Sequence, residues 1–248
     1  MKKRAICALL ALALLGAMAG CGNDEEAQSV SAASSAQETS AASESSAAGE
    51  GSAKGAAKVE GKTLVAVFSW ANNADLPKDV DAVSAATLND SATGGFVGDT
   101  QIMGQTAAEV TGGDYFDILV EKPYPGDEQK TYDQAKQEQL KQARPALSSH
   151  VANMDSYSTI VLVYPNWWGG LPMPVCTFLE EYDFSKKTII PVCCYEAEDS
   201  GAGNSRNDIA ELCDGVVTAG YNLRGNAAST SGTTTDFTNW LEDLPVKF

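Results

Sequence analysis

The stretch VLVYPNWWGGLPMPV, Val161–Val175, joins an apolar run to a loop rich in tryptophan, glycine and proline. The run begins at Thr159 and is rich in β-branched residues, which indicates a strand buried on both faces. Prolines restrict the backbone of the loop, and glycines let it approach a ligand closely. Trp167 and Trp168 add indole faces, which can stack on a flat ring. We interpret this loop as a contact for a planar ligand, with the alternative that one or both indoles pack back into the domain.

Apolar runs alternate with helical patterns on both sides of this stretch. Further strands are predicted at 62–69, 114–120, 188–194 and 215–220. Helices are predicted at 98–111, 127–142, 174–182, 204–213 and 234–244, and a loop at 223–233. Strands that alternate with helices form parallel βαβ units with helices on both faces of the sheet. The pattern therefore predicts an α/β, doubly wound, five-stranded parallel sheet, in which ligands bind outside the carboxyl ends of the strands.

The first 20 residues have the organisation of an export signal, with a basic start, a short apolar core and small residues before Cys21. The sequence Met18-Ala19-Gly20-Cys21 resembles the lipobox of bacterial lipoproteins. This resemblance implies cleavage before Cys21 and a diacylglycerol on its sulfur. The alternative is an ordinary secretory signal followed by a chance cysteine. We expect a lipid-anchored protein on the extracytoplasmic face of the cell membrane.

Residues 21–58 consist mainly of Ser, Ala, Glu and Gly and contain almost no large apolar side chain. Such a segment cannot bury enough surface to offset the entropy of ordering, so it is predicted to be a disordered tether. Residues 59–248 are predicted to form one domain. The formal net charge of the chain is −16. An acidic surface repels nucleic acid and anionic lipid, so membrane contact is expected through the lipid alone.

The cysteines and the histidine give little material for a metal site or a catalytic triad. The cysteines of the predicted domain lie in or beside apolar runs, where a free thiol behaves as a small hydrophobe; they are Cys176, Cys193, Cys194 and Cys213. No Cys/His spacing suggests zinc, and His150 is the only histidine. A redox pair at the adjacent Cys193 and Cys194 is possible, but the simpler interpretation is the end of a buried strand. We predict no metal and name no catalytic acid or base.

The loop after the first predicted strand is a candidate phosphate site. It begins at Ser69 and Trp70 and runs to Ala74, and about two dozen residues then precede the helix that opens at Gly98-Asp99-Thr100. Phosphate sites combine hydroxyls, glycine and the free N–H groups of a helix N-terminus. Ser69, Gly98 and Thr100 suit such a site, whereas the charge of Asp99 is unfavourable unless it points away.

From Lys62 to about Gly220 the sequence resembles the flavodoxin-like family, in the subgroup found in many anaerobic bacteria. The resemblance is carried by LVAVFSW, GDTQIMGQTAAEVTGGDYFDI, EKPYP, ARPALSSHVANMDSYSTIVLVYPNWWGGLPMPVCTFLEEYDFSKKTIIPVCC and SGAGNSRNDI. It implies the strand order 2-1-3-4-5 and an FMN site at the switch point between the first and third strands.

The resemblance also implies roles for residues in three loops. Ser69, with Trp70 beside it, and the turn Gly98-Asp99-Thr100 would hold the FMN phosphate. The isoalloxazine would be flanked by Pro165, Asn166, Trp167, Trp168 and Gly169. The third wall would be formed by Cys194, Tyr195, Ser200 and Gly201.

The sequence departs from the family pattern at three places. An insertion separates Ser69 from Gly98, and Asp99 stands where asparagine is usual. The loop 195–200 is longer and more acidic than usual, which would disfavour extra negative charge on a reduced flavin. Within the insertion, Asp81-x-x-Ser84-x-Ala86-Thr87 resembles the acceptor motif for covalent transfer of FMN to threonine, here Thr87. The alternative is a surface loop with a chance match.

The leading hypothesis is an exported, lipid-anchored FMN-binding protein. It would transfer electrons or reduce a small acceptor such as a quinone, with a redox partner protein or that acceptor as its partner. The alternative is a non-redox ligand- or partner-binding lipoprotein on the same fold, with a degenerate FMN site. Neither hypothesis involves nucleic acid.

Overall fold

The computed structural model describes residues 61–77, 87–90, 95–196, 201–225, 228, 231–246 and 248. The predicted signal peptide, Cys21, the tether 21–58, residues 81–86 of the flavin-transfer motif and Ser200 lie outside the described residues. Thr87 begins a described strand, β3 (Thr87–Asp90).

Parallel strands form the main sheet in the order β5, β1, β7, β8 and β10. Their bounds are β5 Asp114–Asp117, β1 Lys62–Val67, β7 Tyr157–Pro165, β8 Thr188–Tyr195 and β10 Tyr221–Arg224. In chain order this is 2-1-3-4-5, which agrees with the predicted topology. The switch between β1 and β7 therefore lies in the middle of the sheet, and the loops after these strands meet at one edge.

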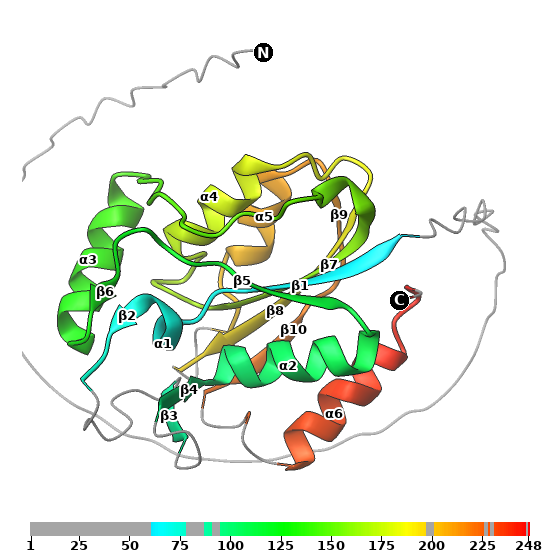
Figure 1. Cartoon of the computed structure of the whole chain (residues 1–248), viewed down its shortest axis with the longest axis horizontal. Helices are drawn as coiled ribbons and strands as arrows, with labels where there is room; N and C mark the ends of the chain where they lie inside the picture. The colour runs from blue at the N-terminus through cyan, green and yellow to red at the C-terminus, as the bar shows by residue number, and fades with distance from the viewer. Residues whose placement is uncertain are drawn as a thin grey trace, which may run out of the picture. The chain divides into compact units, whose positions relative to one another are not determined.

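Helices cover both faces of this sheet (Figure 1). α2 (Asp99–Thr111) and α6 (Ser231–Glu242) lie together on one face. α4 (Met173–Glu181) and α5 (Ser205–Leu212) lie on the other face, and α3 (Glu128–Leu140) packs beside α4. In the part of the chain that the structure describes, no helix is both long and apolar enough to cross a membrane.

Alternate residues of the strands supply two cores. Val65 and Val67 of β1 pack toward α2 and α6, whereas Leu64 and Ala66 pack toward α4 and α5. The same alternation separates Cys193 from Cys194, because successive side chains of a strand point to opposite faces. Both thiols are free and buried, so this pair is part of the core, as the simpler interpretation predicted.

Short elements that the sequence pattern did not predict surround the carboxyl edge of the sheet. α1 (Trp70–Asn73) and β2 (Ala74–Asp75) follow β1, and β2 pairs with β6 (Tyr124–Pro125). β3 and β4 (Gly95–Gly98) form an antiparallel pair that leads directly into α2. At the opposite, amino edge of the sheet, a 3-10 turn, Met154–Ser156, precedes β7.

The fifth strand differs from its prediction. It is divided into β9 (Val216–Val217), which pairs with the start of β8, and β10, which pairs with the end of β8. Leu223 and Arg224 therefore belong to a strand and not to the predicted loop 223–233. The interruption lies opposite Pro191, which has no N–H to contribute to the ladder, and a Cβ on Gly220 would meet the Pro191 side chain at 3.2 Å.

Candidate functional site

The loops after β7 and β8 are hydrogen-bonded to each other at the carboxyl edge. The backbone N–H of Asn166 donates to Cys194 O at 2.7 Å, and its side-chain Nδ2 donates to Gly201 O at 2.7 Å. The N–H of Asn204 donates to Gly169 O at 2.9 Å. Gly203 has a φ of +52°, and a Cβ there would overlap the backbone of Gly169. The structure thus brings together Asn166, Gly169, Cys194 and Gly201 of the predicted site.

Trp167 packs back into the domain. Its ring meets Phe68 edge-on with centroids 5.3 Å apart, and it meets Tyr124 in the same way at 5.2 Å. Phe68 and Tyr124 are fully buried members of the core on the α4 and α5 face. The first of the two indoles therefore follows the alternative interpretation.

The side chain of Trp168 is 45% exposed and packs against α3. Its Nε1 donates to Tyr132 O at 3.0 Å, and the ammonium of Lys136 lies 4.0 Å from the ring centroid. The backbone at Trp168 is left-handed, with φ +55°, a conformation that is uncommon for a residue with a side chain. Contacts with α3 thus fix the direction of this indole, and the stacking role predicted for it stays a prediction.

In the corner of the predicted phosphate site, Ser69 and Gly98 bond the same oxygen atom. Ser69 caps α1, since its Oγ accepts from Ala71 N at 3.2 Å. The same hydroxyl donates to Gln101 Oε1 at 3.3 Å, and the N–H of Gly98 donates to that Oε1 at 2.7 Å. A hydroxyl and a free N–H at a helix N-terminus are the donors that bind an anion. Ser69 and Gly98 therefore lie together as predicted, with the Gln101 carbonyl oxygen between them.

The other residues of this corner are buried. Asp99 is 0% exposed and Thr100 is 3% exposed. The thiol of Cys194 is buried on the same face of the sheet, and burial, with the charge of Asp99 as a smaller cause, raises its pKa. Cys194 thus faces the α2 and α6 core, and its contribution to the loop region is its backbone carbonyl.

A polar chain continues from Gln101 across the sheet edge. Gln101 Nε2 donates to Asn72 Oδ1 at 2.8 Å, and Asn72 Nδ2 donates to Asp117 Oδ1 at 2.9 Å. Tyr115 Oη donates to the same carboxylate oxygen at 3.3 Å. Burial raises the pKa of Asp117, and its hydrogen bonds oppose that shift. Asp117 is thus partly buried in this chain of hydrogen bonds, although it belongs to the edge strand β5.

Asn73 joins the loop after β1 to the loop after β5. Its Nδ2 donates to Ser69 O at 2.9 Å and to Ile118 O at 3.0 Å. Its Oδ1 accepts from Val120 N at 2.8 Å. Sequence reasoning missed Gln101, Asn72 and Asn73. The available signal for Gln101 was its place three residues after Gly98, the position from which a glutamine side chain bonds to the N-cap.

The structure describes only the two ends of the loop that follows β8. Tyr195 closes β8, and its carbonyl accepts from Gly225 N at 2.6 Å. Glu196 accepts from Tyr132 Oη at 2.8 Å, which connects this loop to α3.

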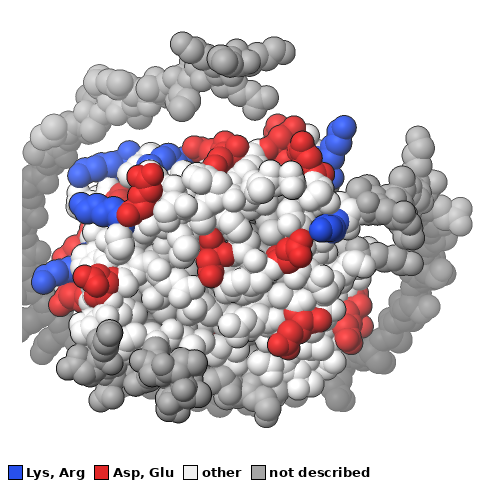
Figure 2. Space-filling model, viewed as in Figure 1, with Lys and Arg blue, Asp and Glu red and all other residues white. Residues whose placement is uncertain are grey.

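The surface in Figure 2 carries scattered acidic side chains. Basic side chains gather mostly where α3 lies, a helix that contains Lys130 and Lys136.

Near the carboxyl edge, two buried polar atoms have no hydrogen-bond partner among the residues that the structure describes. They are Asn166 Oδ1, just after β7, and Trp70 Nε1, just after β1. Buried polar groups nearly always have a partner, so such atoms call for an explanation. An acceptor and a donor of this kind fit a heterocyclic ring that carries both N–H and carbonyl groups.

The chain is similar to known proteins in both sequence and fold. A family model described as flavodoxin matches residues 91–244. A candidate flavoprotein from Bacteroides eggerthii is 22% identical, with a TM-score of 0.53, and the match covers 75% of this chain and 99% of that one. A second, from Bacteroides uniformis, is 24% identical, with a TM-score of 0.50 and coverage of 74% and 99%. These two structures share the fold of this chain.

A flavoprotein from Lactobacillus acidophilus, solved in complex with FMN, is 18% identical, with a TM-score of 0.43 and coverage of 67% and 95%. No curated protein matches the chain.

Proposed function

Because this chain belongs to the flavodoxin family, we propose that it binds FMN at the carboxyl edge of β1, β7 and β8. It would use the flavin to transfer electrons or to reduce a small acceptor such as a quinone. The observation that supports this most directly is the convergence of Ser69 Oγ and Gly98 N on a single oxygen, 3.3 and 2.7 Å away. These are the donors that a phosphate group requires.

Different residues of this edge would bind the phosphate and the ring of FMN. Ser69 and Gly98 would hold the phosphate. Asn166 Oδ1 and Trp70 Nε1 are the candidates to bond the polar atoms of the ring, since both are buried and bond no other atom in the described part of the chain. FMN, when bound, supplies the redox chemistry, and the protein supplies position, electrostatics and exclusion of water.

The flavin proposal is tested by the visible spectrum of the full chain after incubation with FMN and desalting. We expect a retained flavin band, because both the phosphate donors and the ring-bonding atoms are present. Acid precipitation then separates two modes of attachment: released flavin means a dissociable cofactor, whereas a yellow pellet means a covalent one. Thr87→Val is the matched control for the covalent case, and protein from the native host should be compared. Absence of flavin from every sample would contradict the proposal.

We also propose that the chain is exported and anchored to the membrane by a lipid on Cys21, on the sequence argument alone. Cys21→Ser removes the sulfur that would carry the lipid. We expect the parent chain, expressed in a lipoprotein-processing bacterium, to enter the detergent phase of a cloud-point extraction and the variant to stay in water. Cys7→Ser, a change within the predicted signal, is the control and should behave as the parent. Equal partition of Cys21→Ser and parent would contradict the anchor.

One observation favours the second candidate function, a non-redox binding protein on this fold. The phosphate donors already bond the Gln101 side chain, and the carboxylate of Asp99 is buried at the start of the same helix. Both features oppose binding of an anion. If they prevail, the edge would bind an uncharged planar ligand in place of FMN, and a comparison of FMN with riboflavin separates the two functions.

A further inference from the structure

A cavity lies on the side of the tryptophan loop that faces the helices. Its volume is about 370 Å³, within the range of small-molecule pockets. It is bordered by Trp168 to Leu171 of the loop, by the end of α3 at Gln139, by Arg144, and by Asp208 and Glu211 of α5. It shares only Trp168 and Gly169 with the predicted FMN site, so it is a separate place in the fold.

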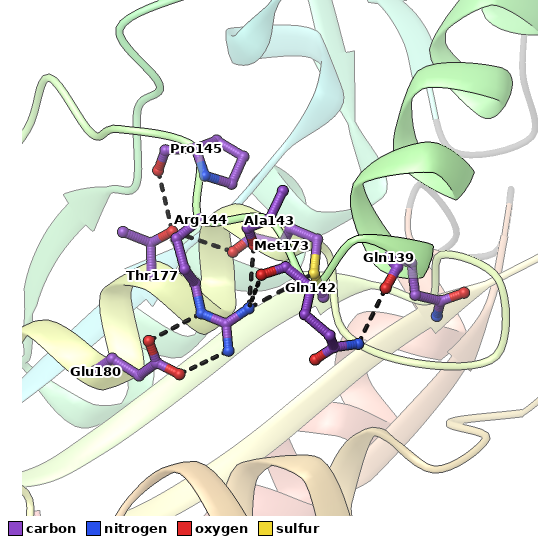
Figure 3. Close-up of polar contacts among 8 residues, drawn as sticks. All are labelled: Gln139, Gln142, Ala143, Arg144, Pro145, Met173, Thr177 and Glu180. Atoms are coloured by element: carbon purple, nitrogen blue, oxygen red, sulfur yellow. Dashed lines mark hydrogen bonds and ion pairs between the residues drawn. The ribbon is translucent and has the colours of Figure 1, made fainter. Parts of the chain in front are cut away.

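Arg144 does not make this cavity an anion site, because its charge is already matched. Its Nε and Nη2 donate to the two carboxylate oxygens of Glu180 at 2.8 and 2.6 Å. Its Nη1 donates to the carbonyls of Gln142 and Ala143 at 3.2 and 3.0 Å. Figure 3 shows the guanidinium held in this fork, directed at Glu180, while the Gln142 side chain reaches back to the carbonyl of Gln139.

The two carboxylates of the cavity have no such match. Asp208 and Glu211 are three residues apart on α5, which places them on the same side of the helix. Among the described residues, neither forms an ion pair. Burial raises the pKa of Asp208. A hydrogen bond from the backbone N–H of Leu171 opposes this shift, and the charge of Glu211 adds to it, so a cation beside these groups would be stabilised.

Gly170 packs closely against Asp208. A Cβ at this position would lie 3.1 Å from Asp208 Oδ2 and 3.3 Å from Gln139 Nε2, closer than ordinary contact distances. A side chain at residue 170 would therefore crowd the Asp208 carboxylate. Trp168 and Met173 add apolar surface to the same cavity. An indole face attracts an ammonium group, and Lys136 already contacts this one at 4.0 Å.

We propose that this cavity binds an organic ammonium ion, a protonated primary amine on a short apolar stem. The ammonium bonds Asp208 and is attracted by Glu211, while the stem packs on Met173 and the Trp168 indole. This site does not depend on FMN, and its occupancy is expected in flavin-free and flavin-loaded protein alike.

The test is calorimetric titration of the full chain with n-pentylamine, with pentan-1-ol as the uncharged probe of equal stem length. We expect saturable binding of the amine and at least tenfold weaker binding of the alcohol, since a hydrogen bond between two charged groups is stronger than one from a neutral hydroxyl. Asp208→Asn and Glu211→Gln remove one charge each while keeping the shape, and Gly170→Ala adds a methyl group that crowds the Asp208 carboxylate. Asp208→Asn and Gly170→Ala should each weaken the amine at least tenfold, and Glu211→Gln severalfold.

Asp214→Asn is the matched control, because this exposed carboxylate follows α5 and does not border the cavity. It should bind the amine as the parent does, and circular dichroism should show all variants folded. The proposal is overturned if the alcohol binds as well as the amine, or if Asp208→Asn, Glu211→Gln and Gly170→Ala all bind as the parent does. Titration with Nα-acetyl-lysine amide distinguishes the source: stronger binding than pentylamine points to a lysine side chain of a protein, and weaker binding to a free amine.

Discussion

Asn73→Asp is expected to lower the free energy of unfolding by roughly 3–5 kcal/mol, as measured by guanidinium denaturation. The side chain of Asn73 is 2% exposed and makes three hydrogen bonds, two as a donor and one as an acceptor. Aspartate preserves the shape and the acceptor but removes both donors. The carbonyl oxygens of Ser69 and Ile118 would then face a carboxylate in a buried place, where an unpaired charge is costly.

The control is Asn72→Ala, at the exposed neighbouring position. Asn72 bonds two side chains and no backbone group, so its loss should cost less than about 1 kcal/mol. The same comparison tests the function, since Asn73 holds the loop that carries Ser69. We expect Asn73→Asp to lose flavin binding while Asn72→Ala retains it. A stability of Asn73→Asp within 1 kcal/mol of the parent would show that the two loops are held together by other contacts.

The strand order of the domain could be predicted because local pattern carries it. Each buried strand is a short apolar run, and the alternation of Val65 and Val67 with Leu64 and Ala66 between two cores explains why the whole run is apolar. The division of the last strand was not predictable in this way. It depends on Pro191 in a neighbouring strand, which is close in space but far along the chain.

The candidate site shows the same limit. The sequence predicted which loops meet, because the carboxyl ends of parallel strands share an edge. It did not predict Gln101, Asn72 or Asn73, since each of them bonds at least one partner that is 29 to 47 residues away. The direction of Trp168 is likewise decided by a carbonyl and an ammonium on α3, and no spacing within the loop records those contacts.

Gln101→Ala is expected to increase the affinity for FMN about tenfold, a gain of ~1.4 kcal/mol, and to leave the affinity for riboflavin unchanged. In the parent, the oxygen Oε1 of Gln101 accepts from Ser69 Oγ and Gly98 N at 3.3 and 2.7 Å. In the proposed site it would thus occupy the place of a phosphate oxygen, and an incoming phosphate would have to displace it. Alanine retains helix propensity and removes the competitor, so both donors become available to the anion. Riboflavin has no phosphate, so its affinity should not depend on whether residue 101 is glutamine or alanine.

The measurement is a fluorescence titration of both flavins against the full chain, Gln101→Ala, and Gln105→Ala as an exposed control one turn further along α2. Gln105→Ala should match the parent for both ligands. If the affinities for FMN and riboflavin change equally, Gln101 acts on the flavin ring or on the stability of α2. It would then not act on the phosphate. Weaker FMN binding would mean that Gln101 supports the ligand through the Asn72 and Asp117 chain. A gain confined to FMN would mean that this chain keeps a functional phosphate corner whose affinity is lowered by one of its own side chains.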